Sequence, residues 1–527
     1  EAIKSTYSDV DASTEGFPVE YEPSFATSTQ ASTSRTADGN YGKGSQLAQF
    51  GRLNYNYAGK YLLQATVRRD GTNKFIGKNR YGIFPSVSGA WKISEESFLK
   101  DRWDWLNSLK LRAGWGVLGS IGSVGDYIYQ SAYKSANVYS FDGTNAVTGW
   151  GLAKFANADI RWEKVTTKNL GLDFGLLKNR LTFVFDLYDK QTTDMIYTVA
   201  LPPSSGIGWF NGSTYGATIN IGKISNRGFE FEANWNDKIG KLSYSVGANA
   251  SFNRNKVIQI GEEGALIYEG GATWLNSSIC RTEDGYAMGQ FYGYIADGIF
   301  KTDAEAAQSA QPDAKSGDLK YRDFNGKDSS GKLTGKPDGK IDDADKTYLG
   351  NPWPKCYYGI NIELAYKGFD MKAYFQGQAG VDLFNATKGI RQSFYADWNT
   401  TSDIFNTSKF GNSNITNLPS VYQTSNTGEI LRDPNGNYKN VSSFFVENGA
   451  YLKLKNFQLG YTLSETASRK IGLKSTRIFI EGSNLFTITK YTGLDPELGG
   501  GVKGRGIETD GVYPQTRLIS LGVNLKF

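Results

Sequence analysis

The last ten residues of the chain alternate between apolar and polar side chains without a break. One side of this alternation is made, in order, by Ile519, Leu521, Val523, Leu525 and Phe527. The intervening residues are polar apart from Leu518. Since successive side chains of a strand point to opposite faces, this period of two predicts a β-strand with one apolar face.

Composition restricts the setting in which such a strand can exist. Aromatic residues make up 14% of the 527 residues and glycine occurs 62 times, which favours strands joined by turns. The mean hydropathy is −0.44, and no apolar run approaches the roughly 20 residues of a membrane helix. The chain is therefore either soluble or a transmembrane β-barrel, whose alternating strands escape hydropathy scans. A net charge of +5, from 58 basic and 53 acidic residues, predicts no nucleic-acid partner.

Several kinds of catalysis are excluded by residue content. The chain has no histidine, which removes Ser-His-Asp and Cys-His catalysis and His-ligated zinc. Glu230 and Glu232 share one strand face, and we expect them to line a wet channel rather than to flank a sugar as glycosidase carboxylates do. We therefore predict that the protein is not an enzyme. Cys280 and Cys356 form no metal motif, and the sequence leaves open whether they form a disulfide or remain two free thiols.

Alternating segments like the last one recur along the chain. The clearest lie at 52–57, 61–70, 83–92, 109–117, 229–236, 242–253, 357–366, 369–377, 444–463 (with a slip in phase near Lys455) and 476–486. Most approach or exceed the roughly 9–11 residues with which a strand crosses a bilayer. Short connections alternate with long ones near 119–163, 193–222, 254–354, 380–443 and 488–515. Strand length and loop asymmetry favour an all-β antiparallel transmembrane β-barrel with long extracellular loops over a soluble β-sandwich, the alternative with the same alternation.

The pattern also divides the chain. Residues 1–45, rich in Ser, Thr, Asp and Gly, are predicted to be an extracellular loop, and residues 46–527 the C-terminal part of the barrel wall. We expect a large extracellular loop at 254–354. The segments add up to about 13 strands, and an odd number cannot close an antiparallel barrel. We therefore expect that N-terminal strands of the barrel are absent from this chain.

Ordered motifs add a family resemblance. They include the run 60–71 (KYLLQATVRRDG), Phe84-Pro85-Ser86-Val87, Asn226-Arg227-Gly228-Phe229-Glu230, Phe291-Tyr292-Gly293-Tyr294, Gly350-Asn351-Pro352 and Tyr491-Thr492-Gly493-Leu494-Asp495-Pro496-Glu497. Together they resemble the SusC/RagA family, the TonB-dependent outer-membrane transporters of Bacteroidota. The resemblance covers nearly the whole chain from residue 60 onward.

What the resemblance implies is an importer of glycans, oligosaccharides or peptides. It implies a barrel of about 22 strands, an N-terminal plug, a TonB-contact segment upstream and a SusD-like surface lipoprotein that acts as a lid. Plug, TonB segment and about nine strands are then expected to lie outside this chain. Two alternatives stay open, namely a structural component of a larger outer-membrane assembly and a passive porin.

One loop has the spacing of a calcium site. After removal of residues 327–337 it reads D-x-N-x-D-G-K-x-D-x-x-D. Side-chain or backbone ligands would come from Asp323, Asn325, Asp338, Lys340 (backbone carbonyl), Asp342 and Asp345. Hard oxygen ligands at this spacing suit Ca²⁺, whose role here would be to stiffen an external loop. A solvated Asp/Gly-rich turn is the alternative.

Loop aromatics are a second feature that the pattern leaves open. The sequence predicts exposed rings at Trp274, Tyr292, Tyr294, Trp353 and Trp398. Such rings either contact the lid or form an interfacial girdle, which we favour, or stack on sugar faces.

Overall fold

The computed structural model describes most of the chain as strands. The described residues are 2–13, 36–100, 102–122, 124–141, 143–200, 209–210, 213–214, 216–261, 264–393, 399–408, 416–424, 429–502 and 504–527. They divide into two compact units, which we describe separately. One comprises Glu1–Ala90, Ala113–Lys168 and Lys190–Lys223, and the other Trp91–Arg112, Asn169–Asp189 and Ile224–Phe527.

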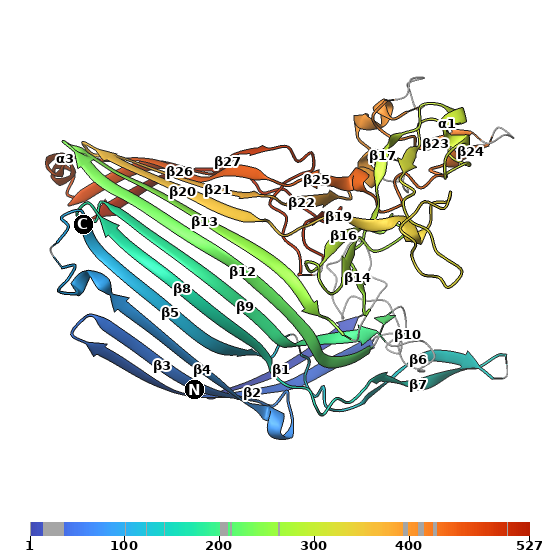
Figure 1. The fold of residues 1–527 in the computed structure, drawn as a ribbon, viewed down its shortest axis with the longest axis horizontal. Coiled ribbons are helices and arrows are strands. Elements are labelled where there is room, and N and C mark those ends of the chain that lie inside the picture. Colours follow the sequence, from blue (N-terminus) through green and yellow to red (C-terminus); the bar gives the residue numbers. More distant parts are fainter. Residues whose placement is uncertain are drawn as a thin grey trace, which may run out of the picture. The chain divides into compact units, whose positions relative to one another are not determined.

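Among the described residues the main sheet has 14 strands, which pair with one another in the order β1-β2-β3-β4-β5-β8-β9-β12-β13-β20-β21-β26-β27-β29 (Figure 1). Their bounds are β1 Ala2–Ser13, β2 Thr36–Tyr57, β3 Tyr61–Thr72, β4 Tyr81–Lys92, β5 Leu106–Ser120, β8 Glu163–Leu176, β9 Leu181–Ala200, β12 Gly216–Ile239, β13 Leu242–Gln259, β20 Cys356–Tyr366, β21 Phe369–Ala379, β26 Tyr451–Thr462, β27 Ser475–Thr489 and β29 Leu518–Lys526. This up-and-down order gives every strand from β2 to β27 two neighbours against which to satisfy its backbone, as a wall in lipid requires.

The prediction of a loop over residues 1–45 was wrong wherever the structure describes that segment. Residues 2–13 form β1, which pairs antiparallel with β2 from Ala2↔Leu47 to Ser13↔Thr36. Residues 14–35 lie outside the described residues. With β1 the sheet has 14 strands instead of about 13. Because this number is even, the argument from strand parity for missing strands was also wrong.

The alternation of short and long connections is as predicted. Lys367 and Gly368 join β20 to β21 with φ of 48° and 90°, the two positive φ angles of a tight type I′ hairpin. Another short turn at Ala58 and Gly59, φ 52° and 69°, follows β2. The opposite connections are long, and the one after β5 contains the hairpin β6 (Ala132–Ser140) and β7 (Ala146–Lys154).

The first unit has a small aromatic core. Phe75 and Phe84 both meet the edge of Trp162, with ring centroids 5.6 and 5.5 Å apart. Val124 and Ile160 complete this buried cluster. The core joins the residues that follow β3 and β5 to those that directly precede β8.

Strands of the second unit have two contrasting faces. On β27 and β29 the apolar side chains are exposed, with Leu521 at 78% and Ile478 at 45%. The opposite face carries Arg477 and Glu481, paired across the strands with Asn524 and Ser520. Soluble monomers rarely expose a continuous apolar surface of this kind, whereas a bilayer covers it. Among the described residues no helix has the length and apolarity to cross a membrane.

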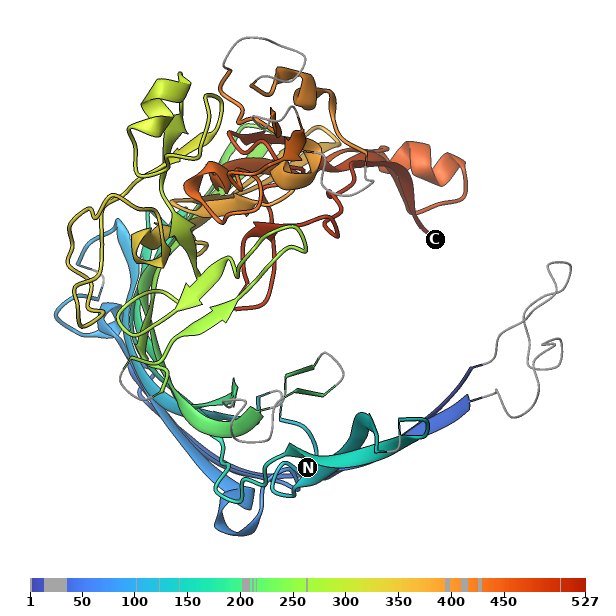
Figure 2. The same cartoon turned by 90° about the vertical axis from the view of Figure 1, so that its right-hand side faces the viewer.

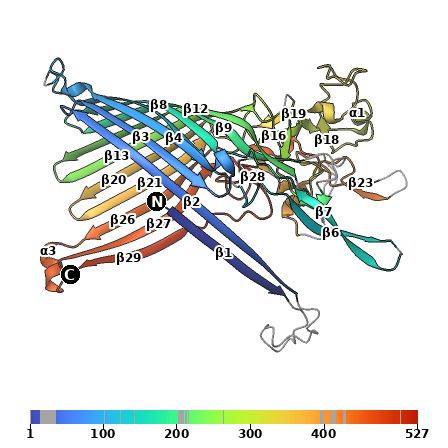
Figure 3. The same cartoon turned by 90° about the horizontal axis from the view of Figure 1, so that it is seen from below.

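The long connections of the second unit fold into a lobe beyond the strand ends. Figure 2 shows its yellow-green and orange segments gathered together, and Figure 3 shows them at the other end of the strands from the turn that carries α3 (Glu465–Lys470). Its elements are β14 Ile267–Glu269, β15 Cys280–Thr282, β16 Gln290–Tyr294, β17 Ala296–Ile299, α1 Asp303–Ala307, β18 Leu319–Tyr321, β19 Lys346–Gly350, β22 Asp382–Asn385, α2 Lys388–Arg391, β23 Tyr422–Thr424, β24 Ile430–Arg432, β25 Val446–Asn448 and β28 Ile507–Glu508. Phe291, Phe384 and Phe445 form its fully buried centre.

Candidate functional site

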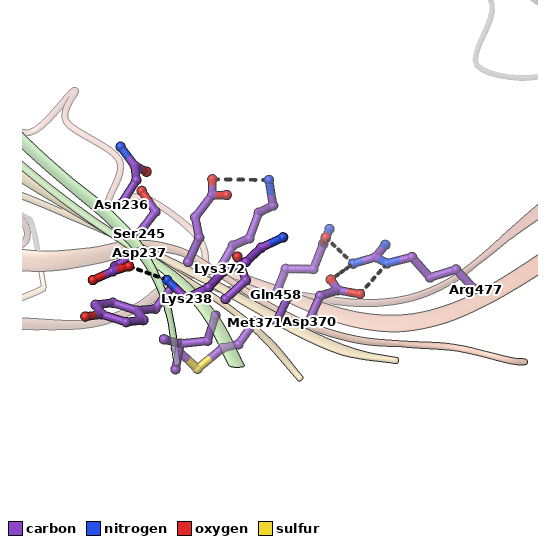
Figure 4. Close-up of a pocket in the computed structure, with 14 residues that line it drawn as sticks. Asn236, Asp237, Lys238, Ser245, Asp370, Met371, Lys372, Gln458 and Arg477 are labelled. Carbon is purple, nitrogen blue, oxygen red and sulfur yellow. Dashed lines mark hydrogen bonds and ion pairs between the residues drawn. The ribbon is translucent and has the colours of Figure 1, made fainter. Parts of the chain in front are cut away.

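Charged side chains join neighbouring strands on the polar face of the second unit. Arg477 Nε lies 2.9 Å from Asp370 Oδ1, and its Nη2 donates to Gln458 Oε1 at 2.7 Å. Lys372 bonds Glu363 at 3.2 Å on the adjacent strand pair. Figure 4 shows these pairs side by side, and they line a pocket of about 840 Å³.

A missing side chain makes the Arg477 contact possible. Arg477 on β27 reaches Asp370 on β21 across β26, the strand between them. It does so over Gly460, where a Cβ atom would lie 2.5 Å from the guanidinium. Arg112 on β5 likewise spans β8 to reach Asp186 on β9 at 2.9 Å. These bridges fix the relative position of three strands at a time and keep the polar face charged.

The two carboxylates singled out in the sequence belong to this polar face. Ser251 Oγ donates to Glu230 at 2.9 Å, and Asn234 donates to Glu232 at 2.7 Å. On the opposite face Phe229 stacks on Phe252 with centroids 4.5 Å apart. Each carboxylate bonds a neutral neighbour along a strand wall, in keeping with the predicted channel lining.

A buried lysine fastens the last long connection to the wall. Lys453 on β26 is 1% exposed, and its Nζ lies 3.0 Å from Asp495 and 3.0 Å from Glu497. Lys455 adds a second contact to Glu497 at 3.0 Å. The strand pairing shifts between Leu454 and residue 456, which confirms the predicted phase slip near Lys455. The acidic end of the Tyr491–Glu497 motif is thus an anchor point.

The residues with calcium-loop spacing do come together. The insert 327–337 turns back on itself at the bridge Lys327↔Leu333. Asp323 consequently accepts the amides of Asp338 and Gly339, at 3.2 and 2.8 Å. The fully buried Asp345 accepts three amides, from residues 324, 325 and 342, at 3.0–3.1 Å.

The remaining members of the loop bond to backbone too. Asn325 accepts the amide of Gly335 at 2.7 Å, Asp338 that of Lys340 at 3.1 Å, and Asp342 that of Ala344 at 2.7 Å. In the part of the chain that the structure describes, no three acidic, His or Cys side chains cluster so as to hold a metal ion. The calcium site therefore remains a prediction.

The loop aromatics occupy different environments. Trp274 is 2% exposed and donates to the carbonyl of Ala386 at 3.0 Å, so its predicted exposure was wrong. It is part of the lobe core. Trp353 is half-buried and donates to the carbonyl of Met288 at 2.6 Å. Trp398 lies outside the described residues, while Tyr292 and Tyr294 are half-buried on β16.

The cysteines are free thiols. Cys280 lies in the lobe core, where burial raises its pKa to about 12, and Cys356 begins β20. The disulfide alternative is thereby excluded.

The sequence did not predict the roles of Lys453 and Arg477. Their ion-pair partners Asp495 and Asp370 lie 42 and 107 residues away in the chain. The available signal was an ionisable residue in a strand that crosses a bilayer.

These features match a known class of membrane protein. Residues 4–273 match the family described as TonB dependent receptor-like, beta-barrel. The chain belongs to this family. The chain is thus part of an outer-membrane β-barrel, as predicted.

Individual relatives agree with this assignment. TonB-dependent receptor P3 of Formosa agariphila is 33% identical over 488 residues, which cover 91% of this chain and 45% of that protein. TonB-dependent receptor SusC of Bacteroides thetaiotaomicron is 30% identical over 493 residues, covering 91% and 44%. The chain therefore spans about half the length of the curated relatives it matches.

A solved structure shows the same fold. The structure of the RagAB peptide transporter superposes with a TM-score of 0.78 at 23% identity, over 100% of this chain and 52% of that one. This likeness establishes the fold of the 14-stranded antiparallel sheet.

Proposed function

We propose that this chain forms part of the wall and the outer lobe of a TonB-dependent importer of oligosaccharides or peptides. The observation that carries the proposal is the pair of opposed strand faces. One face exposes apolar residues such as Leu521, and the other carries ion pairs such as Arg477–Asp370 along a pocket. A wall of this kind lets a hydrophilic solute pass through lipid.

Family membership supports the proposal that TonB supplies the energy and that a surface lipoprotein is the partner. TonB would act through an N-terminal region outside this chain, and a SusD-like surface lipoprotein would cover the lobe. The name SusC of one relative and the RagAB peptide transporter structure support a two-component importer for either solute class.

Uptake by cells tests this proposal. A strain that lacks the gene is complemented with it and given fluorescent oligosaccharides and peptides, with and without a protonophore that removes the driving force of TonB. We expect energy-dependent uptake of one solute class, and a lipoprotein that co-purifies with the tagged protein. Energy-independent uptake would instead indicate a porin, and normal uptake in the deletion strain would indicate a structural component.

We propose, separately, that the 323–345 loop binds Ca²⁺. The support is the ligand spacing and the closed ring that brings Asp323 next to Asp338 and Gly339. Metal analysis of the purified protein is expected to find one calcium ion, which Asp323→Asn with Asp345→Asn removes. Equal calcium content in both proteins would show that these carboxylates only hold backbone amides.

A further inference from the structure

The lobe contains a four-stranded sheet with two unlike faces. Strands β14, β15, β16 and β19 pair antiparallel in this order. Cys280 and Phe291 point from one face into the lobe core. The strand partners Tyr268↔Arg281, Arg281↔Gln290 and Tyr292↔Tyr348 place those five side chains on the other face. We call this set, with Tyr286 and Glu283, the tyrosine face.

The rings of the tyrosine face form a continuous row. Tyr268 and Tyr292 have centroids 6.4 Å apart, and Tyr292 and Tyr348 5.4 Å. Tyr286 stacks on Tyr348 at 4.2 Å. The Arg281 guanidinium carbon lies 4.4 Å from the centroid of Tyr292. The two ends of the row, Tyr268 and Tyr286, are 50% and 45% exposed, so rings remain available to a ligand.

Three buried polar atoms on this face lack a hydrogen-bond partner among the described residues. They are Arg281 Nε, a donor, Gln290 Oε1, an acceptor, and the hydroxyl of Tyr348, which can act as either. Buried polar groups are almost always paired, because an unpaired one loses its hydration without compensation. A donor and an acceptor on directly opposed residues therefore point to a ligand that offers both kinds of group.

The charges of the face select the ligand class. Arg281 is neutralised by an ion pair with Glu283. On the adjoining part of the sheet, Lys346 forms an ion pair with Asp343 at 2.8 Å. With its cations already paired, the face offers little attraction to an anion. A neutral polyhydroxylated ligand fits better, since its hydroxyls both donate and accept and its apolar ring faces stack on tyrosines.

We propose that the tyrosine face is a binding site for a neutral saccharide, a few sugar rings long. The paired charges and the unpaired donor and acceptor of the face support this occupant. The proposal rests on the proposed import function and narrows the solute from oligosaccharide or peptide to saccharide.

Binding measurements on the full-length protein in detergent test the site. An array of neutral oligosaccharides is screened first, and the strongest binder is titrated by calorimetry. The exposed pair Tyr268→Ala with Tyr286→Ala is expected to weaken binding about tenfold, and Gln290→Leu by a few fold. Tyr513→Ala is the matched control, since Tyr513 is 81% exposed in another loop, and it should bind like wild type.

Three outcomes would overturn the proposal. In the first, no oligosaccharide of the array binds. In the second, the double tyrosine variant binds as tightly as the wild type. In the third, a co-purified lipoprotein or a peptide mixture protects the face and sugars do not. If the double variant does not fold, Gln290→Leu still tests the site. An unchanged thermal melting temperature confirms that each variant folds. Energy-dependent uptake is measured in the same strains. Uptake that persists without saccharide binding would reject this site and leave the import function intact.

Discussion

The membrane strands and the lobe of the second unit use opposite ways of placing apolar side chains. In β29 the apolar residues point away from the protein, and Leu521 is 78% exposed. In the lobe Phe291, Phe384 and Phe445 are fully buried. The difference shows that the strands take their apolar environment from lipid, whereas the lobe has to build a core of its own.

The two regions also satisfy their backbone differently. Strands pair with strands, and their charged side chains remain free to bond one another, as Arg477 and Asp370 do. In the lobe, irregular backbone depends on carboxylates, and Asp345 alone accepts three amides. In the lobe Asp345 therefore holds backbone amides, whereas in the wall Asp370 joins strands by bonding another side chain.

The largest effect is expected from the lobe core. Phe291→Ala should destabilise the lobe by about 3–5 kcal/mol, because it leaves a cavity in a closely packed cluster. Protease sensitivity of the lobe on whole cells measures this, while gel mobility of the unheated protein reports on the barrel. Phe405→Ala is the control, with its ring 63% exposed. If barrel and lobe are lost together, the two regions are one cooperative unit and the comparison fails.

A smaller loss is expected from a charge on the lipid side. Leu521→Arg should destabilise the wall by about 2–4 kcal/mol, as arginine does near the midplane of a bilayer. Ser520→Arg is the matched control, because Ser520 lies on the polar face opposite Glu481. Folding into lipid vesicles, followed by urea titration, measures both. Equal effects of the two variants would contradict the assignment of faces.

The lobe is also expected to differ from the wall in the pH dependence of its stability, because of Asp433. Burial raises the pKa of Asp433 in the lobe to about 7, although the amides of Tyr438 and Asn437 oppose the shift. The positive charge of Lys439 lowers the pKa of Asp433, and the negative charge of the buried Asp318 raises it. The unfolded chain ionises Asp near pH ~3.9, so between that pH and about 7 the folded lobe binds the extra proton.

Lobe stability should therefore fall as pH rises through this window, with no further loss from this group above it. The expected loss is on the order of 2 kcal/mol between pH 5 and 7. Thermal unfolding at the two pH values measures it, and Asp433→Asn, a neutral isostere, should remove the dependence. A variant that keeps the wild-type pH profile would assign the effect to another group.

The wall was predictable from sequence and the lobe was not, for a physical reason. Alternation is local, so β29 and the phase of Glu230 could be read from neighbouring residues. β1 was missed because its Ser, Thr and Asp content is typical of loops. The burial of Trp274 and of Lys453 depends on segments far away in the chain, and no local pattern specifies them.

The smallest effect concerns two ion pairs of the polar face. Asp370→Asn should cost about 1 kcal/mol, since Arg477 is largely covered and bonds this carboxylate through two nitrogens. Glu363→Gln should cost less than about 0.5 kcal/mol, because both members of its pair with Lys372 are more than half exposed and solvated. Urea titration in vesicles compares them. Similar values for both variants would mean that the Arg477–Asp370 ion pair, which passes over Gly460, stabilises the wall no more than an ordinary surface ion pair. Strand pairing alone would then hold the wall together.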